Sequence, residues 1–339
     1  VSALLLDLEH DLPLSGGREL NSIFIGGGTP SLFAGAAIER LLTGIRRRVG
    51  VATDAEITLE ANPGAVDAVH FEGYLAAGVN RLSLGVQSFD RQMLHTLGRI
   101  HTPADAVEAL TLARAAGFQN INLDLMFGLP SQALSEAMGD LDAAIALAPN
   151  HLSWYQLTIE PNTLFHAHPP LTPDEELLWE IQQTGQARLQ QAGDPQYEVS
   201  AYARAGDSCR HNLNYWTFGD YLGIGAGAHA KLTTGRGVVR RWKQKHPAAY
   251  MEQLEKGQNV FEERQLQASD LSLEFMMNAL RLNQGVPRAL FEQRTGLPLS
   301  AAQEGLEAAT NKGLMEHSRD FLRASALGRS YLNDLLGLF

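Results

Sequence analysis

Cysteine, basic residues and long apolar runs are all scarce in this sequence. Among its 339 residues there is one cysteine, Cys209, so no internal disulfide can form, and no charged-then-apolar signal segment opens the chain. We therefore expect a protein of the reducing cytoplasm. No apolar run approaches the roughly 20 residues of a membrane-spanning helix. The 27 Lys and Arg residues are outnumbered by 38 Asp and Glu residues, and the net charge of −11 disfavours binding to nucleic acid.

The length and composition are those of a folded chain with more than one part. Hydrophobic residues make up 45% of the chain and charged residues 19%, which excludes a disordered or fibrous protein. A length of 339 residues is about twice the usual domain size of ~150, so we expect one large domain and an appendage. The first residue is Val rather than Met, and VSALLLDLEHDL already has the pattern of a helix. We expect the natural chain to begin further upstream.

A unit of helix, glycine, turn and strand recurs in the first two thirds of the chain. Three helical segments end at Gly78, Gly117 and Gly193, where glycine permits the left-handed conformation that ends a helix. The separation of Gly78 from Gly117 matches the length of one strand-plus-helix unit, and that of Gly117 from Gly193 matches two such units. Two further helices are predicted to begin at Thr102-Pro103 and Thr172-Pro173, with Thr as the N-cap. The predicted strands cover 22–27, 56–61, 81–87, 120–127, 152–160 and 197–203.

Strands that alternate with helices predict a parallel sheet, either an open doubly wound sheet or a full or partial (β/α) barrel. Polar or glycine residues stand at or near the carboxyl end of each predicted strand, which is where the loops of a barrel build its site. Any one of them could be a cap or turn residue, but their recurrence in register favours the barrel. They are Gly26 to Thr29, Glu60 with Asn62, Gln87 with Ser88, Asp124, Glu160, and Ser200 with Tyr202.

Three parts are predicted along the chain: a barrel over 1–204, a cap or extension over 205–268, and a C-terminal domain over 269–339. The middle part has an irregular sequence that contains HNLNYW, GIGAGAH and RRWKQK. The last part predicts three helices, a two-stranded wing and a closing helix, which is the order of a winged helix. Its groove-facing helix carries Glu304 and Glu307, which would repel phosphate. We therefore interpret it as a packing or partner domain.

A run of glycines follows the first predicted strand. Gly26-Gly27-Gly28-Thr29-Pro30 lets a ligand approach bare backbone, and its N–H groups and the following helix start could bind a carboxylate or phosphate. Its spacing matches neither a P-loop nor GxGxxG, and a tight strand-to-helix turn is the alternative. GIGAGA at 223–228 matches the dinucleotide pattern GxGxxA. Because no clear helix follows it, we interpret it as a glycine-rich loop.

Two groups of residues have side chains suited to binding a ligand. Glu60, Gln87, Arg99 and Asp124 lie on or just after successive predicted strands, where they could bind the amino group, hydroxyls and carboxylate of an amphoteric ligand. A buried charge network that positions loops is the alternative. His211, in HNLNYW, places an imidazole beside aromatic rings, which suits ligation of haem iron and stacking on a macrocycle. A purely structural histidine is the alternative here.

Several strings along the chain resemble one family: IFIGGGTPSLF, EITLEANPG, RLSLGVQSF, LGRIH, NLDLMFGLP, LSWYQLTIEPNT and HNLNYW. Over nearly its whole length the chain resembles the radical S-adenosylmethionine proteins related to oxygen-independent coproporphyrinogen III oxidase. HNLNYW and the C-terminal segment resemble the haem chaperone branch of that family. The resemblance implies a partial (β/α) barrel of the radical S-adenosylmethionine type with its first strand missing here, and haem as cargo. It places S-adenosylmethionine at Gly27, Gly28, Thr29, Glu60, Gln87, Arg99 and Asp124, and haem at His211, Tyr215 and Trp216.

The chain departs from this family in its cysteines. The family holds a 4Fe-4S cluster through a CxxxCxxC loop after its first strand, whereas this chain has only Cys209. We expect the first strand and its cysteines to belong to the full-length protein, which would carry the cluster. This chain then provides no metal ligand set and should be catalytically inert, and no catalytic residue is assigned.

Three functions remain open from the sequence. The first is a haem chaperone that delivers haem to client haemoproteins, membrane-bound ones included, and HNLNYW and the tail favour it. The second is an oxygen-independent coproporphyrinogen III oxidase, which decarboxylates propionate side chains in porphyrin biosynthesis. The third is a barrel isomerase or lyase that uses Glu60 and Asp124 as acid and base without a cofactor. The oligomeric state is left open.

One local cluster of basic residues stands out against the negative net charge. It comprises Arg240, Arg241, Lys243 and Lys245. We predict that it attracts haem propionates or a membrane-bound client near the mouth of the barrel. A solvated loop is the alternative.

Overall fold

The computed structural model describes all residues from Val1 to Phe339. The chain forms two compact units, and each is built from segments that are far apart in the sequence. The first unit comprises Val1–Asn21, Arg40–Asp54 and Arg210–Phe339, and the second comprises Ser22–Glu39 and Ala55–Cys209. The division into 1–204, 205–268 and 269–339 stays a prediction. None of the helices has the length and hydropathy needed to cross a bilayer.

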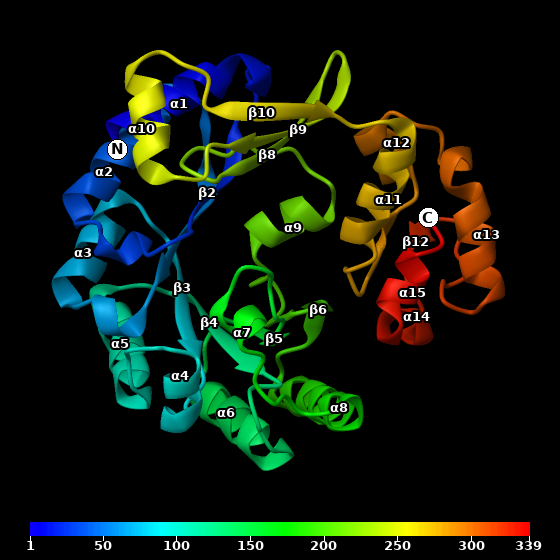
Figure 1. Ribbon diagram of the computed structural model, residues 1–339, viewed down its shortest axis with the longest axis horizontal. Coiled ribbons are helices and arrows are strands. Elements are labelled where there is room, and N and C mark those ends of the chain that lie inside the picture. The colour runs from blue at the N-terminus through cyan, green and yellow to red at the C-terminus, as the bar shows by residue number, and fades with distance from the viewer. The chain divides into compact units, whose positions relative to one another are not determined.

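A curled seven-stranded sheet forms the centre of the α/β fold (Figure 1). Strands β2, β3, β4 and β5 are parallel neighbours, as the alternation of strands and helices predicts. The prediction of one strand over 197–203 is wrong. This segment folds as a short hairpin, and the second strand of the hairpin runs antiparallel to β5. The strand order is β1 (Leu20–Ile25), β2 (Val51–Ala61), β3 (Arg81–Gln87), β4 (Asn120–Phe127), β5 (His151–Gln156), β7 (Ala201–Ala203) and β6 (Gln196–Glu198).

Helices connect these strands, and Figure 1 shows several of them along one side of the sheet. Three of them end at Gly78, Gly117 and Gly193 in the left-handed conformation, as predicted. Thr102 caps its helix as predicted, but Thr172 does not, because the Asp174 side chain accepts the Leu177 N–H and the helix begins at Glu175. The helices are α2 (Gly35–Arg46), α3 (Ala68–Ala77), α4 (Arg91–Thr96), α5 (Pro103–Ala116), α6 (Leu134–Ala146), α7 (Leu164–Ala167) and α8 (Glu175–Ala192).

The two faces of the sheet differ in polarity because side chains alternate along each strand. Leu82 and Leu84 of β3 and Leu123 of β4 are buried in the apolar core. The alternate positions of the same strands carry Ser83, Asn122 and Asp124, among others. The second face therefore carries a row of polar groups that ends at the carboxyl edge of the sheet.

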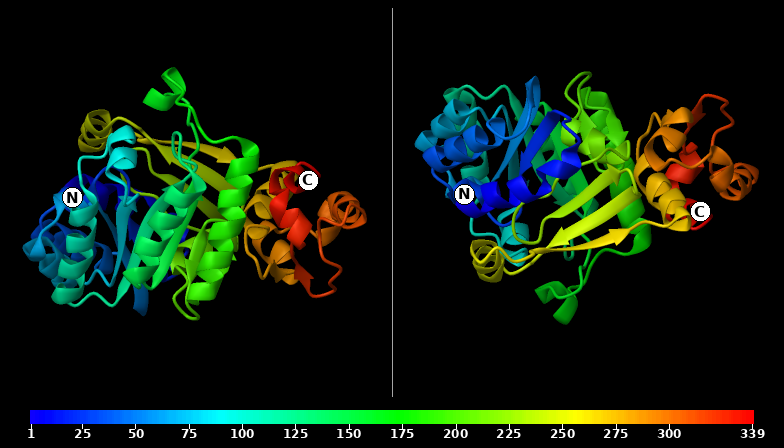
Figure 2. Two further views of the ribbon diagram at one scale, coloured as in Figure 1. Left: turned by 90° about the horizontal axis from the view of Figure 1, so that it is seen from below. Right: turned by 90° about the horizontal axis from the view of Figure 1, so that it is seen from above.

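The first unit contains a three-stranded antiparallel sheet of order β10-β9-β8 (Figure 2). The irregular structure predicted for 205–268 is therefore wrong. Strand β9 lacks the usual alternation of apolar and polar residues, because two of its buried residues are Arg241 and Lys243. Each of them is paired with carboxylates. The elements are α1 (Ser2–Asp11), α9 (Arg210–Trp216), β8 (His229–Thr234), β9 (Gly237–Lys243), α10 (Pro247–Glu255) and β10 (Phe261–Gln265).

The C-terminal segment contains the three helices that the sequence predicts. Its wing is shorter than predicted, with one antiparallel bridge between Met315 and Ala324, while β12 pairs with β11 instead. The closing helix is divided in two at Tyr331. The elements are α11 (Ala268–Ala279), β11 (Val286–Pro287), α12 (Ala289–Thr295), α13 (Gln303–Asn311), β12 (Phe321–Leu322), α14 (Ala326–Ser330) and α15 (Leu332–Leu336).

Candidate functional site

The glycine run after β1 packs closely on a carboxylate of β2. The Gly27 N–H donates to Glu60 Oε2 at 3.0 Å. A Cβ at position 26 would lie 2.7 Å from the Phe24 ring and 2.9 Å from the Glu60 carboxyl carbon, so a larger residue would have to displace these side chains. Gly27 and Gly28 have φ of 79° and 64°, in the left-handed region that glycine adopts freely. The Gly27 donor predicted for a ligand is thus already used by Glu60.

Thr29 leads into a short 3₁₀ turn at Pro30–Leu32 rather than into a helix. Helix α2 begins only at Gly35. The helix start predicted directly after the glycine run is therefore wrong, and the run ends as a loop. Its exposed backbone at Gly26, Gly27 and Gly28 lies at the carboxyl edge of β1.

Gln87 is held at the end of β3 by a tyrosine that the sequence reasoning missed. The Tyr155 hydroxyl donates to Gln87 Oε1 at 2.8 Å. Gln87 is buried and has φ of 68°, an uncommon conformation for a residue other than glycine. Burial and the charges of Asp124 and Glu60 raise the pKa of Tyr155 to about 12, although Arg99 opposes this. Tyr155 therefore stays a neutral donor among the predicted site residues.

Asp124 lies half-buried on β4 with both carboxylate oxygens bonded. Ser83 Oγ donates to Oδ2 and Asn122 Nδ2 donates to Oδ1, each at 2.8 Å. Burial raises the pKa of Asp124, while hydrogen bonds from Ser83, Asn122 and Ser153 oppose the rise. The pKa of Glu60 is also raised, first by burial and further by the charge of Asp124. The two carboxylates are therefore close enough to repel each other.

Arg99 contributes a cation to this group of residues. It is exposed in the loop after α4, and its charge lowers the pKa of Tyr155. Two carboxylates, an amide and a guanidinium are thus near one tyrosine at one edge of the sheet. This set can accept hydrogen bonds from an amino group or hydroxyls and can donate to a carboxylate, as an amphoteric ligand requires.

The haem candidates lie on α9, where His211 and Tyr215 are one turn apart. Their rings meet edge to face with centroids 4.7 Å apart, and Tyr215 lies 4.4 Å from the Tyr221 ring. Burial and Tyr221 raise the pKa of Tyr215 to about 12, so its phenol is neutral near pH 7. Among these three half-buried rings, the imidazole is the one suited to bind iron at neutral pH.

Trp216 has a different neighbour. The Arg281 guanidinium, in the segment after α11, lies 4.2 Å from the centroid of the Trp216 ring. The indole N–H of Trp216 is buried and has no hydrogen-bond partner. The structure therefore brings His211 and Tyr215 together, while the Trp216 ring lies 6.3 Å from the Tyr215 ring and also makes a cation–π contact.

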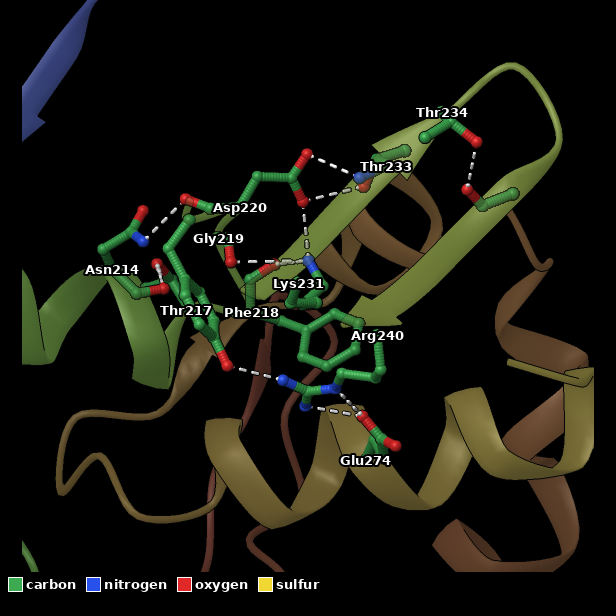
Figure 3. Close-up of polar contacts among 12 residues, drawn as sticks. Asn214, Thr217, Phe218, Gly219, Asp220, Lys231, Thr233, Thr234, Arg240 and Glu274 are labelled. Atoms are coloured by element: carbon green, nitrogen blue, oxygen red, sulfur yellow. Dashed lines mark hydrogen bonds and ion pairs between the residues drawn. The ribbon is translucent and has the colours of Figure 1, made fainter. Parts of the chain in front are cut away.

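A buried lysine holds the turn that ends the α9 segment (Figure 3). Lys231 Nζ donates to the Phe218 carbonyl at 2.8 Å and to Asp220 Oδ1 at 2.8 Å. Phe218 has φ of 53°, so this turn is a strained conformation that its contacts must maintain. Burial raises the pKa of Asp220, but Lys231, Arg18 and other donors outweigh it and lower the pKa to about 2. We call Lys231, Asp220 and the 218–219 carbonyls the α9 clamp.

The predicted basic cluster is not an exposed patch. Arg241 and Lys243 are buried, and Lys243 Nζ lies 2.5 Å from Asp7 and 2.8 Å from Asp11. Arg240 is bonded to Glu274 and to the Tyr221 hydroxyl. Only Lys245 is exposed. The prediction that this run attracts propionates or a membrane is wrong, because its charges are neutralised within the fold.

Cys209 does not belong to a metal site. It is buried, and its Sγ lies 3.4 Å from Glu56 Oε1. No group of three or more His, Cys, Asp or Glu side chains could hold a metal ion.

Comparisons with known proteins agree with this geometry. Residues 14–144 match the family model of the Radical SAM superfamily, and residues 266–331 match the HemN C-terminal domain. A solved structure, coproporphyrinogen III oxidase (HemN) from Escherichia coli, superposes with a TM-score of 0.82 at 24% identity, covering 99% of this chain and 81% of that one. The fold is therefore the partial barrel of radical S-adenosylmethionine proteins with a HemN-type C-terminal domain.

Curated relatives define the family more narrowly. Heme chaperone HemW of Escherichia coli is 50% identical over 340 residues, which cover 100% of this chain and 89% of the relative. Heme chaperone HemW of Mycobacterium tuberculosis is 37% identical over 334 residues, covering 96% and 83%. The chain belongs to the HemW family.

Proposed function

We propose that this protein binds haem at α9 and passes it to client haemoproteins. The observation that carries this proposal is the cluster of His211, Tyr215 and Tyr221 rings, in a chain that is 50% identical over its full length to a protein named heme chaperone. A neutral imidazole is a common axial ligand of haem iron, and aromatic rings can pack on the macrocycle. His211 would be the iron ligand, with Tyr215 and Trp216 against the porphyrin.

A binding site for S-adenosylmethionine is proposed at the carboxyl edge of the sheet. Glu60, Gln87 and Asp124 would accept from its amino group and hydroxyls, and Arg99 would bind its carboxylate. Gly27, Gly28 and Thr29 would pass beside its methionine end. The residues present fit this ligand, because the acceptors and the cation surround one neutral tyrosine. In a protein that also holds a reduced cluster, this cofactor would supply the chemistry of hydrogen-atom abstraction.

The 4Fe-4S cluster that the family implies does not fit these residues. Three thiolates are needed, and the chain offers one cysteine, Cys209, which is buried against Glu56. We therefore assign the cluster to no residue of this chain and derive no reaction step from it.

The clients are proposed to be haemoproteins, membrane-bound ones among them, that the protein reaches from the cytoplasm. Cys209 forms no disulfide, which is compatible with a reducing compartment. The alternative, decarboxylation of coproporphyrinogen, is supported by the likeness to HemN, which at 24% identity concerns the fold. Turnover of coproporphyrinogen under anaerobic, reducing conditions would favour that alternative.

Transfer of haem tests the proposal directly. The protein is loaded with one equivalent of haem, separated from free haem, and mixed with an apo-haemoprotein whose Soret band differs. The proposal expects the acceptor band to grow as the donor band falls, faster than from a haem–albumin control. Loss of haem at the rate of the control, or failure to load, would contradict it.

A further inference from the structure

A row of hydrogen-bonded side chains crosses the polar face of the sheet and ends at Asp124. Ser83 of β3, Asn122 of β4 and His151 of β5 are aligned neighbours in the strand register. His151 Nδ1 lies 2.6 Å from Asn122 Oδ1, and its Nε2 lies 2.9 Å from the Tyr197 hydroxyl. Asn122 Nδ2 donates to Ser83 Oγ at 2.7 Å and to Asp124 Oδ1 at 2.8 Å. We call these four residues before Asp124 the relay.

The hydrogen bonds of the relay all run in one direction, from Tyr197 toward Asp124. Burial lowers the pKa of His151 well below 6.5, so its ring is neutral and carries one proton. That proton is on Nδ1, because Asn122 Oδ1 can only accept, and Tyr197 then donates to Nε2. A reversed Asn122 amide would turn its NH₂ toward this N–H and its oxygen toward the Asp124 carboxylate. The ionised Asp124 carboxylate requires the NH₂ of Asn122 on its side, and the neutral histidine with its proton on Nδ1 is the form that matches this orientation.

We propose that Ser83 and Asn122 are positioning residues that keep Asp124 ionised and fixed as an acceptor in the cofactor pocket, with His151 and Tyr197 fixing Asn122. This inference rests on the proposed function, in which Asp124 binds S-adenosylmethionine. None of these positioning residues was expected from the sequence to take part in the site.

The electrostatic surroundings of Asp124 explain why such donors are needed. Burial favours the protonated form of Asp124, which would no longer accept two hydrogen bonds freely. Arg81 of β3 favours the ionised form, whereas the neutral His151 and Tyr155 add no charge. Ser83 and Asn122 each donate a 2.8 Å hydrogen bond to Asp124 and, with a smaller contribution from Ser153, stabilise its ionised form. They stabilise the charge without introducing a cation that would compete for the ligand.

The ionisation of Asp124 can be measured without cofactor. In protein labelled with ¹³Cγ-aspartate, the Asp124 resonance is assigned by its loss in Asp124→Asn and followed against pH. Ser83→Ala and Asn122→Leu should each raise the pKa of Asp124 by about one unit or more, because each removes a hydrogen bond to a charged group. Ser83→Thr, which keeps the hydroxyl, should leave it at the wild-type value.

Thr58→Val is the matched control, since the Thr58 hydroxyl is buried on the neighbouring strand β2 and bonds to nothing. It should not change the pKa of Asp124. An unchanged pKa in both Ser83→Ala and Asn122→Leu would overturn the proposal. The small Ser83→Ala change keeps the test decisive if Asn122→Leu fails to fold.

Equilibrium dialysis with labelled S-adenosylmethionine at pH 6 and pH 8 connects the relay to the pocket. Ser83→Ala should weaken binding more at pH 6 than at pH 8, while Thr58→Val should follow the wild type at both. Equal loss at the two pH values would overturn the relay. If Asp124→Ala binds as well as the wild type, or the wild type does not bind, the proposed cofactor site fails instead, and the ¹³C titration still decides whether the relay controls Asp124.

Discussion

Replacement of Lys231 by Met tests the α9 clamp. The Lys231 side chain is 1% exposed and donates to the Phe218 and Gly219 carbonyls and to Asp220. Met fills a similar volume but removes the charge and leaves the Asp220 carboxylate with its other donors only. Breaking a buried ion pair costs about 3–5 kcal/mol. Because Arg18 still bonds Asp220, we expect a loss near the lower end, about 3 kcal/mol.

Against the effect of burial, the lowered pKa of Asp220 reflects the Lys231 ion pair together with the hydrogen bonds from Arg18 and Thr233. Its lowering from 3.8 to about 2 corresponds to about 2 kcal/mol of stability. The folded pKa lies below the unfolded one, so this stability is present above about pH 4 and is lost as the pH falls toward 2. Acid should therefore weaken the same buried carboxylate contacts that Lys231→Met removes in part.

The assay is urea unfolding at pH 7 of the wild type, Lys231→Met, Asp220→Asn and the double variant, followed by tryptophan fluorescence. The double variant should recover part of the stability lost in Lys231→Met, because it removes the uncompensated charge. Arg18→Ala is the control: its side chain is 50% exposed, so its loss should cost under about 1 kcal/mol. If the double variant were no more stable than Lys231→Met, the buried charge would not be the cause.

Three further predictions concern other parts of the fold. Burial raises the pKa of Asp140 from 3.8 to about 6, so between these values the folded state holds a proton that the unfolded chain releases. The free energy of unfolding should therefore fall as the pH rises from about 4 to about 6. Urea unfolding of Asp140→Asn should not show this dependence on pH. Gly26→Ala would place Cβ 2.9 Å from the Glu60 carboxyl carbon, and the displaced carboxylate should weaken S-adenosylmethionine binding about tenfold in dialysis. Gly185→Ala would place Cβ 2.0 Å from the Trp154 ring and should lower the unfolding free energy by about 3 kcal/mol.

Each of these predictions has a clear contrary result. A slope that persists in Asp140→Asn would assign it to another group, and unchanged dialysis for Gly26→Ala would separate the glycine run from the cofactor. Gly139→Ala is the matched control for Gly185→Ala, because Gly139 is exposed on α6 with open space around it. It should be neutral or slightly stabilising, and a similar loss in both variants would refute the packing argument.

The parallel strands were the most predictable part of the fold. The strands at 81–87 and 120–127 are confirmed to the residue, because each apolar run begins a few residues after a glycine that ends a helix. The hairpin of β6 and β7 was not predictable, since two three-residue strands read as one run. Strand β9 was missed because Arg241 and Lys243 are buried, and only their carboxylate partners on α1 and β10 make this favourable.

The site was predictable where residues stand at strand ends. Glu60, Gln87 and Asp124 were predicted on that ground, and the structure brings them near Tyr155. Tyr155 and Asn122 were missed because their roles depend on the register between neighbouring strands. His151, Ser153 and Tyr155 occupy alternate positions along β5. This alternation is a signal that could have placed these three side chains on the polar face of the sheet.

A haem titration followed by Soret absorbance tests the central claim most directly. It compares the wild type, His211→Ala and the control His246→Ala, whose histidine is exposed elsewhere in the same unit. The account predicts saturable binding by the wild type and by His246→Ala, with an affinity at least about tenfold weaker and a shifted Soret band in His211→Ala. Equal affinity and identical spectra in all three proteins would contradict the assignment of haem to α9.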